Sequence, residues 1–171
     1  MSPALRYDFT PDMESATITM VREFNAPRPL VWECYTTADL LDRWYAPKPL
    51  TARTKHLDFR VGGYWLFAMI TPEGQEYWSR QDYQAIQPTE SITMLDAFSD
   101  AEASINPDLP RAVVEMHFAA AEDGCVVTSV TRYPSKDDLQ KVIDMGMEAG
   151  MASTLERLDE LLATLSEKDA Q

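Results

Sequence analysis

The sequence has few of the residues that carry metal and redox chemistry. Its 171 residues include two cysteines and two histidines. Neither type occurs at the close spacing that metal ligands or a disulfide scaffold require. Cys34 and Cys125 lie far apart, and we assign His56 and His117 to surface or edge positions of different strands. We therefore expect no metal site and no cofactor.

Motifs for covalent and phosphate chemistry are also missing. The sequence has no Gly-x-Ser-x-Gly nucleophile elbow, no phosphate-binding loop and no dinucleotide-binding fingerprint. The pair Gly62-Gly63 lies between two stretches with strand periodicity, which indicates a turn and not a phosphate cradle. No catalytic residue can be assigned on these grounds, and the sequence favours a protein that is not an enzyme.

Positive charge and long apolar runs are likewise scarce. Asp and Glu number 28 against 15 Lys and Arg, which gives a formal net charge of -13. Such a chain repels phosphate backbones and anionic membrane surfaces, so neither nucleic acid nor a membrane is an expected partner. No stretch reaches the roughly 20 apolar residues of a membrane span, and residues 1–15 lack the pattern of a signal peptide. The expectation is a soluble cytoplasmic protein.

The chain does contain enough apolar residues for one packed domain. The hydrophobic fraction is 45% and the aromatic fraction 10%, which is too much for a disordered chain. Polar residues and two prolines predict a flexible arm over residues 1–15, the domain covers residues 16–165, and residues 166–171 form a frayed tail.

Hydrophobic periodicity predicts the order of the elements. Residues 16–25 alternate as a half-buried strand does. Pro29 and Thr37 then begin two short helices, the second ending near Trp44. Six strands follow over residues 51–61, 64–70, 76–86, 91–98, 111–120 and 125–133, with a polar loop at 99–110. Consecutive strands joined by short turns predict an antiparallel sheet.

One long helix is predicted from the cap Ser135 to about residue 165. Its apolar stripe is rich in leucine toward the C-terminus, but Gly146 and Gly150 lie in the stripe nearer its N-terminus. Each glycine costs roughly 1 kcal/mol relative to alanine inside a helix. Either aromatic side chains of the sheet fill the space above the glycines, or the space stays open for a ligand. The predicted fold class is α+β, a curved antiparallel sheet that grips this helix.

Several sequence motifs resemble one family. They are "FNAPRPLVWECYTTADLLDRWYAP" (residues 24–47), "DFRVGGYWLFAM" (58–69), "YQAIQPTESI" (83–92), and Gly150 followed by "MASTLERLDELL". In this order they resemble the START-like (SRPBCC, helix-grip) superfamily. More narrowly, the chain is similar to the branch named for homologues of the activator of the heat-shock-protein-ninety ATPase.

The resemblance implies a fold and a range of functions. The superfamily binds lipids, hormones and polyketide-like molecules between sheet and helix, and some members are cyclases or hydrolases. The namesake branch contains a co-chaperone. A shared fold does not decide among these activities.

The apolar residues of the inward sheet face and of the helix stripe are the candidates for a ligand cavity. Methionine adapts to irregular apolar shapes, and ligand sites are mostly apolar. The same residues could equally form a filled core, and Trp44 could be a lid or a structural staple. The candidates are Trp44, Trp65, Phe67, Met69, Tyr83, Met94, Phe98, Met116, Phe118, Gly146, Met147, Gly150 and Met151.

Two further features have alternative interpretations. Asp58 and Arg60 share one side of a strand before the Gly62-Gly63 turn, where they form either an ion pair that stabilises the hairpin or a polar anchor at the mouth of a cavity. Tyr77 and Trp78 are adjacent on a strand, so one ring should face outward and could contribute to a partner surface.

The principal hypothesis is that the protein binds a small apolar or amphipathic molecule between sheet and helix. The alternative is a co-chaperone-like interaction or stress-response module, which predicts a filled core and an exposed apolar patch around Tyr77-Trp78. A weaker alternative is a small hydrolase or cyclase, which needs an acid–base pair inside the cavity. A homodimer is also expected, because symmetric pairs are common.

Overall fold

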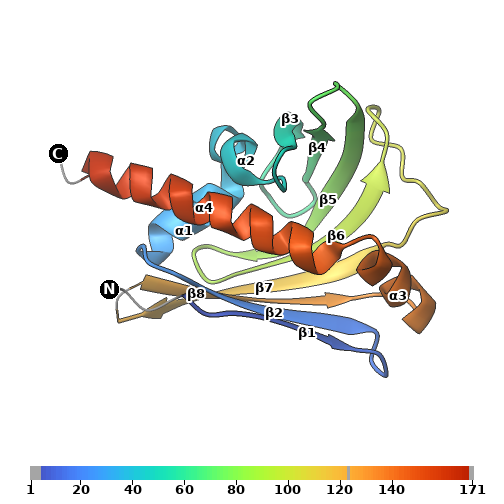
Figure 1. Ribbon diagram of the computed structural model, residues 1–171, viewed down its shortest axis with the longest axis horizontal. Coiled ribbons are helices and arrows are strands. Elements are labelled where there is room, and N and C mark those ends of the chain that lie inside the picture. Colours follow the sequence, from blue (N-terminus) through green and yellow to red (C-terminus); the bar gives the residue numbers. More distant parts are fainter. Residues whose placement is uncertain (1–4, 123, 170–171) are drawn as a thin grey trace.

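The computed structural model describes residues 5–122 and 124–169, and these form one curved sheet with helices on its concave side (Figure 1). The 8-stranded antiparallel sheet has the order β1-β2-β8-β7-β6-β5-β4-β3. Its strands are β1 Tyr7–Asp12, β2 Thr17–Phe24, β3 Thr51–Leu57, β4 Tyr64–Ile70, β5 Glu76–Gln87, β6 Ser91–Ser99, β7 Ala112–Ala121 and β8 Gly124–Arg132. The helices are α1 Arg28–Thr36, α2 Ala38–Trp44, α3 Lys136–Asp144 and α4 Met147–Asp169. The predicted α+β helix-grip class is confirmed.

Local pairing accounts for most of the sheet. Each strand from β3 to β7 pairs antiparallel with the next strand along the chain. One long-range pairing completes the sheet: β2 runs beside β8, with Thr17 opposite Arg132 and Phe24 opposite Cys125. The chain therefore returns to its first strands before it enters the last helices. No helix in the described part of the chain is long and apolar enough to cross a membrane.

The predicted flexible arm is wrong over residues 7–12. These residues form β1, an edge strand in which Tyr7 lies opposite Arg22 and Asp12 opposite Thr17. Pro11 does not prevent this, because an edge strand leaves one row of N–H groups without a ladder partner. Residues 1–4 lie outside the described part. At the other end α4 continues to Asp169, beyond the predicted start of the tail, and residues 170–171 again lie outside the described part.

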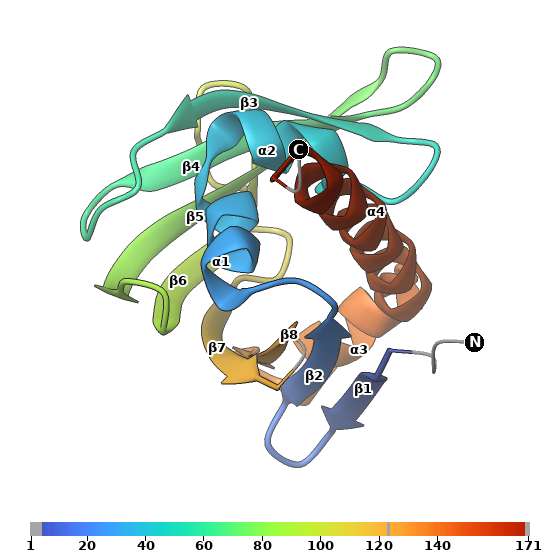
Figure 2. The same cartoon turned by 90° about the vertical axis from the view of Figure 1, so that its left-hand side faces the viewer.

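The two short helices pack inside the curve of the sheet, on the same side as α4 (Figure 2). Pro27 and Pro29 begin α1, where the missing N–H groups cost nothing. The side chain of Trp44, at the end of α2, is 1% exposed, and its indole N–H donates to the carbonyl of Cys34 at 3.0 Å. Of the two roles considered for Trp44, a lid or a structural link, the structure shows the link, because Trp44 joins α2 to α1.

The predicted long helix is two helices. Ser135 caps α3 as expected, its side chain accepting from the N–H of Asp138 at 3.1 Å. The chain then breaks at Met145 and Gly146, where φ of Gly146 is 87°. A glycine in this left-handed conformation ends a helix without the steric cost that a Cβ would bring. Gly146 is therefore a stop between α3 and α4, whereas Gly150 lies inside α4.

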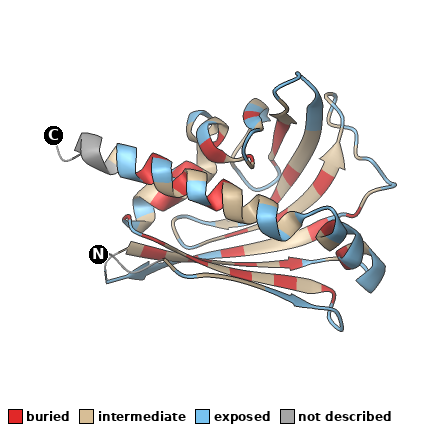
Figure 3. Ribbon diagram, viewed as in Figure 1, coloured by how far each residue is buried: buried red, intermediate tan, exposed pale blue. Residues whose placement is uncertain are grey.

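Helix α4 is anchored from Leu155 onward (Figure 3). Leu155, Leu158, Leu161 and Leu162 are buried in one cluster with α1, α2 and the sheet. Arg157 adds two polar links, because its guanidinium donates at 2.7 Å to the carbonyls of Ala46 and Leu50 in the segment after α2. The N-terminal half bears the partly buried Met147 and Met151 in place of leucines.

We expect the two glycines to respond oppositely to alanine. Gly146→Ala should lower the free energy of unfolding by about 1–2 kcal/mol, since an L-residue is strained at positive φ. Gly150→Ala should raise it by roughly 0.5–1 kcal/mol, because alanine favours helix and no atom lies within 4 Å of the added Cβ. Urea unfolding of both variants measures the difference. Equal effects would contradict the assigned helix break.

Candidate ligand cavity between the sheet and helix α4

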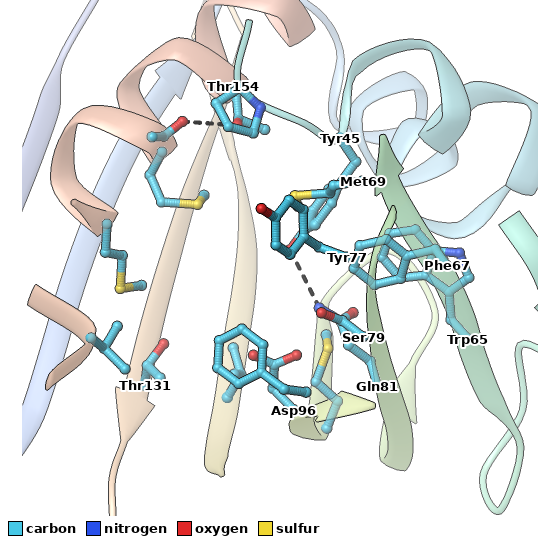
Figure 4. Close-up of a pocket in the computed structure, with 18 of the residues that line it drawn as sticks. Tyr45, Trp65, Phe67, Met69, Tyr77, Ser79, Gln81, Asp96, Thr131 and Thr154 are labelled. Carbon is cyan, nitrogen blue, oxygen red and sulfur yellow. Dashed lines mark hydrogen bonds between the residues drawn. The ribbon is translucent and has the colours of Figure 1, made fainter. Parts of the chain in front are cut away.

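A cavity of about 900 Å³ lies between the concave face of the sheet and the N-terminal half of α4 (Figure 4). Its walls come from inward side chains of β2, β4, β5, β6, β7 and β8, from the end of α2 and from α4. Tyr77 and Met145, two of the exposed large apolar residues, lie on its lining and mark the side that reaches solvent. The size falls in the range of about 300–1,000 Å³ that is usual for small-molecule sites.

The structure brings most of the sequence candidates together on this lining. Those that line the cavity are Trp44, Trp65, Phe67, Met69, Tyr83, Met94, Phe98, Met116, Gly146, Met147, Gly150 and Met151. Phe118 is the exception. It lies on the inward face of β7 but under α1, where its ring meets Trp32 at 5.1 Å and Tyr35 at 5.3 Å between centroids. Phe118 is therefore part of the packed core.

Aromatic rings form the wall beneath α2. Trp65 and Phe67 of β4 stack with their centroids 3.8 Å apart, and the ring of Tyr45 meets Trp65 edge-on at 4.9 Å. These rings pack against one another, and a Cβ built on Gly146 or Gly150 would meet none of their atoms within 4 Å. The aromatic side chains of the sheet therefore do not fill the space above the helix glycines.

The backbone at Gly150 faces open space. A Cβ built on Gly150 would have no atom within 4 Å, and Gly150 lies on the cavity lining. The sequence left two alternatives for the helix glycines: aromatic side chains fill the space above them, or the space stays open. At Gly150 the space is open. Gly146 also borders the cavity, but its positive φ already explains why it is glycine.

One group of polar side chains lies on the part of the wall formed by β5, β6 and the residue after α2 (Figure 4). The amide of Gln81 donates to the hydroxyl of Tyr45 at 3.3 Å. Asp96, on the neighbouring strand, faces the same space, and burial raises the pKa of its carboxyl to about 6 although a hydrogen bond from Gln81 lowers it. Burial and the charge of Asp96 raise the pKa of Tyr45 to about 12.

Sequence reasoning missed Asp96 and Gln81, although the signal was present. Asp96 lies midway between Met94 and Phe98, and Gln81 lies two residues before Tyr83, so strand alternation puts both on the inward face. Only apolar residues were considered as inward candidates. A charged residue on the same side of a strand as buried apolar residues is a strong indication of a functional site, because such residues are seldom buried.

A second buried charge near the cavity has a partner. Arg22 of β2 is 7% exposed and lies on the lining, but its guanidinium donates to the carboxylate of Asp159 on α4 and to the carbonyl of Glu23. Its charged group also lies 4.9 Å from the ring centroid of Phe24. Arg22 thus ties α4 to the sheet and has its charge balanced within the protein.

Asp58 and Arg60 do not lie on the cavity lining. Their side chains form an ion pair at 2.6 Å in the connection between β3 and β4. The expected anchor at the cavity mouth is wrong, and the ion-pair alternative is the arrangement found. The predicted strand ends at Leu57, before both residues, because the chain turns there toward Gly62 and Gly63.

Tyr77 and Trp78 point to opposite sides of β5. Tyr77 lines the rim of the cavity and is 51% exposed, while the ammonium of Lys55 lies 5.8 Å from the ring centroid of Trp78. The two rings therefore do not form one outer patch. The ring of His56 lies 4.4 Å from that of Tyr64. Among the described residues, no group of three His, Cys, Asp or Glu side chains could hold a metal ion.

A curved antiparallel sheet around a C-terminal helix, with an apolar cavity between them, defines the START-like helix-grip class of proteins. Within this class the model of the family "Activator of Hsp90 ATPase homolog 1-like protein" matches residues 25–163, and the chain belongs to that family. No relative was found among curated proteins.

Solved structures from several bacteria are similar to the chain over most of its length. Protein Ms6760 from Mycobacterium smegmatis shares 30% identity, with a TM-score of 0.85 over 93% of this chain and 97% of that one. A protein from Arthrobacter aurescens shares 25% identity, with a TM-score of 0.86 over 92% and 91%. A third, from Staphylococcus epidermidis, shares 26%, with a TM-score of 0.80 over 91% and 94%.

The half-buried carboxyl of Asp96 should make stability depend on pH in a defined way. In the unfolded chain Asp96 titrates near 3.8 and in the folded protein near 6, so the folded state holds the proton more tightly. Stability contributed by the protonated carboxyl is present below about pH 4 and is lost as the pH rises through about 6. Asp96→Asn should therefore gain stability over the wild type at about pH 7.5 and lose that gain at about pH 4.

The gain should reach up to about 3 kcal/mol, since one unit of pKa shift corresponds to about 1.4 kcal/mol. Urea unfolding at both pH values measures it. Glu148→Gln, which removes an exposed carboxylate from α4, is the charge-matched control and should show little change. A gain for Asp96→Asn that does not vary with pH would show that Asp96 does not titrate in this way.

Proposed function

We propose that the protein binds a small, mainly apolar molecule in the cavity between the sheet and α4. The observation that supports this most is the open space of about 900 Å³ next to Gly150. A packed interior leaves few voids larger than a water molecule. A space of this size between otherwise well-packed elements is therefore a feature to be explained, and a ligand explains it.

The lining fits such a ligand. Trp65, Phe67 and Met69 form an apolar wall on β4, and Met147 and Met151 face them from α4. Ligand sites of this kind combine an apolar surface with a few placed polar groups. The flexible methionine side chains allow the helix wall to adapt to the shape of the occupant.

A protein-interaction role is the second candidate, because the family description refers to an activator of the Hsp90 ATPase. That alternative predicts a filled core and an outer apolar patch around Tyr77 and Trp78. The open cavity and the placement of Tyr77 on its rim favour the ligand hypothesis. An enzymatic role has less support, because Asp96 and the hydroxyl of Tyr45 are joined through the amide of Gln81 and not directly.

Filling the cavity from the helix tests the proposal. Gly150→Leu places a side chain in the open space without backbone strain, since Gly150 lies in an ordinary helical conformation inside α4. N-phenyl-1-naphthylamine, a neutral apolar dye that fluoresces in apolar surroundings, serves as the probe. We expect saturable binding to the wild type. For Gly150→Leu the dissociation constant should be at least tenfold higher, which is a loss of about 1.4 kcal/mol of binding free energy.

The matched control is Ala149→Leu, which adds the same side chain one residue away on the exposed side of α4. It should bind the dye as the wild type does. Equal binding by Gly150→Leu and Ala149→Leu would contradict the proposal, and so would the lack of saturable binding in the wild type. Gly146→Leu is unsuitable for this test, because positive φ would strain any side chain there.

A further inference from the structure

The interior of the cavity carries one acidic group that forms no ion pair in the part of the chain that the structure describes. The charged residues on the lining are Arg22, Glu76, Asp96 and Asp100. Arg22 is paired with Asp159, and Glu76 is paired at 2.5 Å with Arg53 at the surface. Asp100 accepts from the N–H groups of Glu102 and Ser104 in the exposed loop after β6. None of the ion pairs among the described residues includes Asp96.

The neighbours of Asp96 are polar but neutral. Gln81 is its hydrogen-bonding neighbour, and the tyrosines Tyr45 and Tyr133 lie close enough for its charge to raise their pKa. Both hydroxyls stay protonated at neutral pH. A buried carboxylate is costly unless a charged partner compensates it. An occupant with a positive charge would provide that partner.

The aromatic wall favours the same kind of occupant. Tyr45, Trp65 and Phe67 border the cavity, and an aromatic face attracts a cation that comes within about 6 Å of it. The hydroxyl of Tyr45 accepts from Gln81, which leaves its own proton available to the cavity. Carboxylate, rings and hydroxyl border one space, and on its far side the methionines of α4 provide an apolar surface.

We propose that this cavity takes amphipathic molecules with a basic nitrogen, and that the protonated nitrogen is held by Asp96 while the apolar body lies against the aromatic wall and α4. This inference rests on the proposed function and names the ligand class for the same site. It predicts selectivity by charge: a cationic head group binds better than a neutral one of the same size, and an anionic one binds worst.

Three naphthalene probes that differ in the head group test this: 1-naphthylmethylamine, 1-naphthalenemethanol and 1-naphthoate. We expect calorimetric titration at about pH 7.5 to give binding of the amine about tenfold tighter than that of the alcohol, as a charge-assisted hydrogen bond in a buried site provides. The carboxylate should bind most weakly. Salt at about 0.15 M screens the general attraction of the acidic surface.

Asp96→Asn should remove the preference, so that amine and alcohol bind about equally. Glu148→Gln changes the net charge by the same amount on the exposed side of α4 and should keep the preference. The wild type offers a test without substitution. Because burial raises the pKa of Asp96 to about 6, the preference for the amine should decline as the pH falls from about 7.5 to about 5, while binding of the alcohol stays constant.

The outcomes separate the two proposals. Binding of the alcohol without any preference for the amine overturns the inference and leaves the proposed function standing. A preference that survives in Asp96→Asn shows that another group holds the nitrogen and also overturns it. Tighter binding of the carboxylate than of the amine would overturn the inference as well. If none of the three probes binds, the proposed function and the inference both fail.

Discussion

The separation between helix α4 and the sheet is the constraint on which the rest of the structure depends. Leu155 to Leu162 pack this helix into the core, Arg157 binds the carbonyls of the segment after α2, and Arg22 pairs with Asp159 from the sheet side. All of these contacts lie at Leu155 or beyond it along α4. Nearer the N-terminus, Met147 and Met151 pack against Ile18 and Met20 of β2 and also border the cavity. Because a helix is stiff, it cannot bend further toward the concave face without losing its backbone hydrogen bonds.

The residues of the N-terminal half are consistent with that separation. Gly146 lets the chain change direction between α3 and α4, so that α4 can cross the sheet independently of the preceding helix. Gly150 adds no side chain at a point where a Cβ would meet no atom within 4 Å, and Met147 and Met151 present flexible thioethers. The N-terminal half of α4 therefore lacks the stabilisation that buried leucine side chains would contribute. The leucine cluster at the other end provides the attachment that the fold needs.

Among the acidic residues on the lining of this largely apolar cavity, Asp96 forms no ion pair in the described part of the chain, and two polar side chains lie near it. Asp96 and Gln81 come from adjacent strands, and Tyr45 reaches them from the end of α2. Burying Asp96 raises its pKa and makes the protonated form more stable in the folded state. The protein therefore bears a cost at neutral pH that a hydrophobic residue at the same position would avoid, and such a cost is typical of binding sites.

The sequence by itself determined strands β2 to β8, the short helices and the face to which most residues of these strands point, because these follow from local periodicity and turn residues. It also determined the family resemblance, which the match over residues 25–163 confirms. It did not determine the edge pairing of β1 or the break at Gly146, since a partner strand and a positive φ leave little trace in composition. Met116 and Phe118 show the same limit: they share one face of β7, yet Met116 borders the cavity and Phe118 lies under α1. Alternation fixes the side of a sheet, whereas the distance to the next layer decides whether space is filled. Only the tertiary structure decides that distance, because it depends on where elements far apart in sequence come to rest.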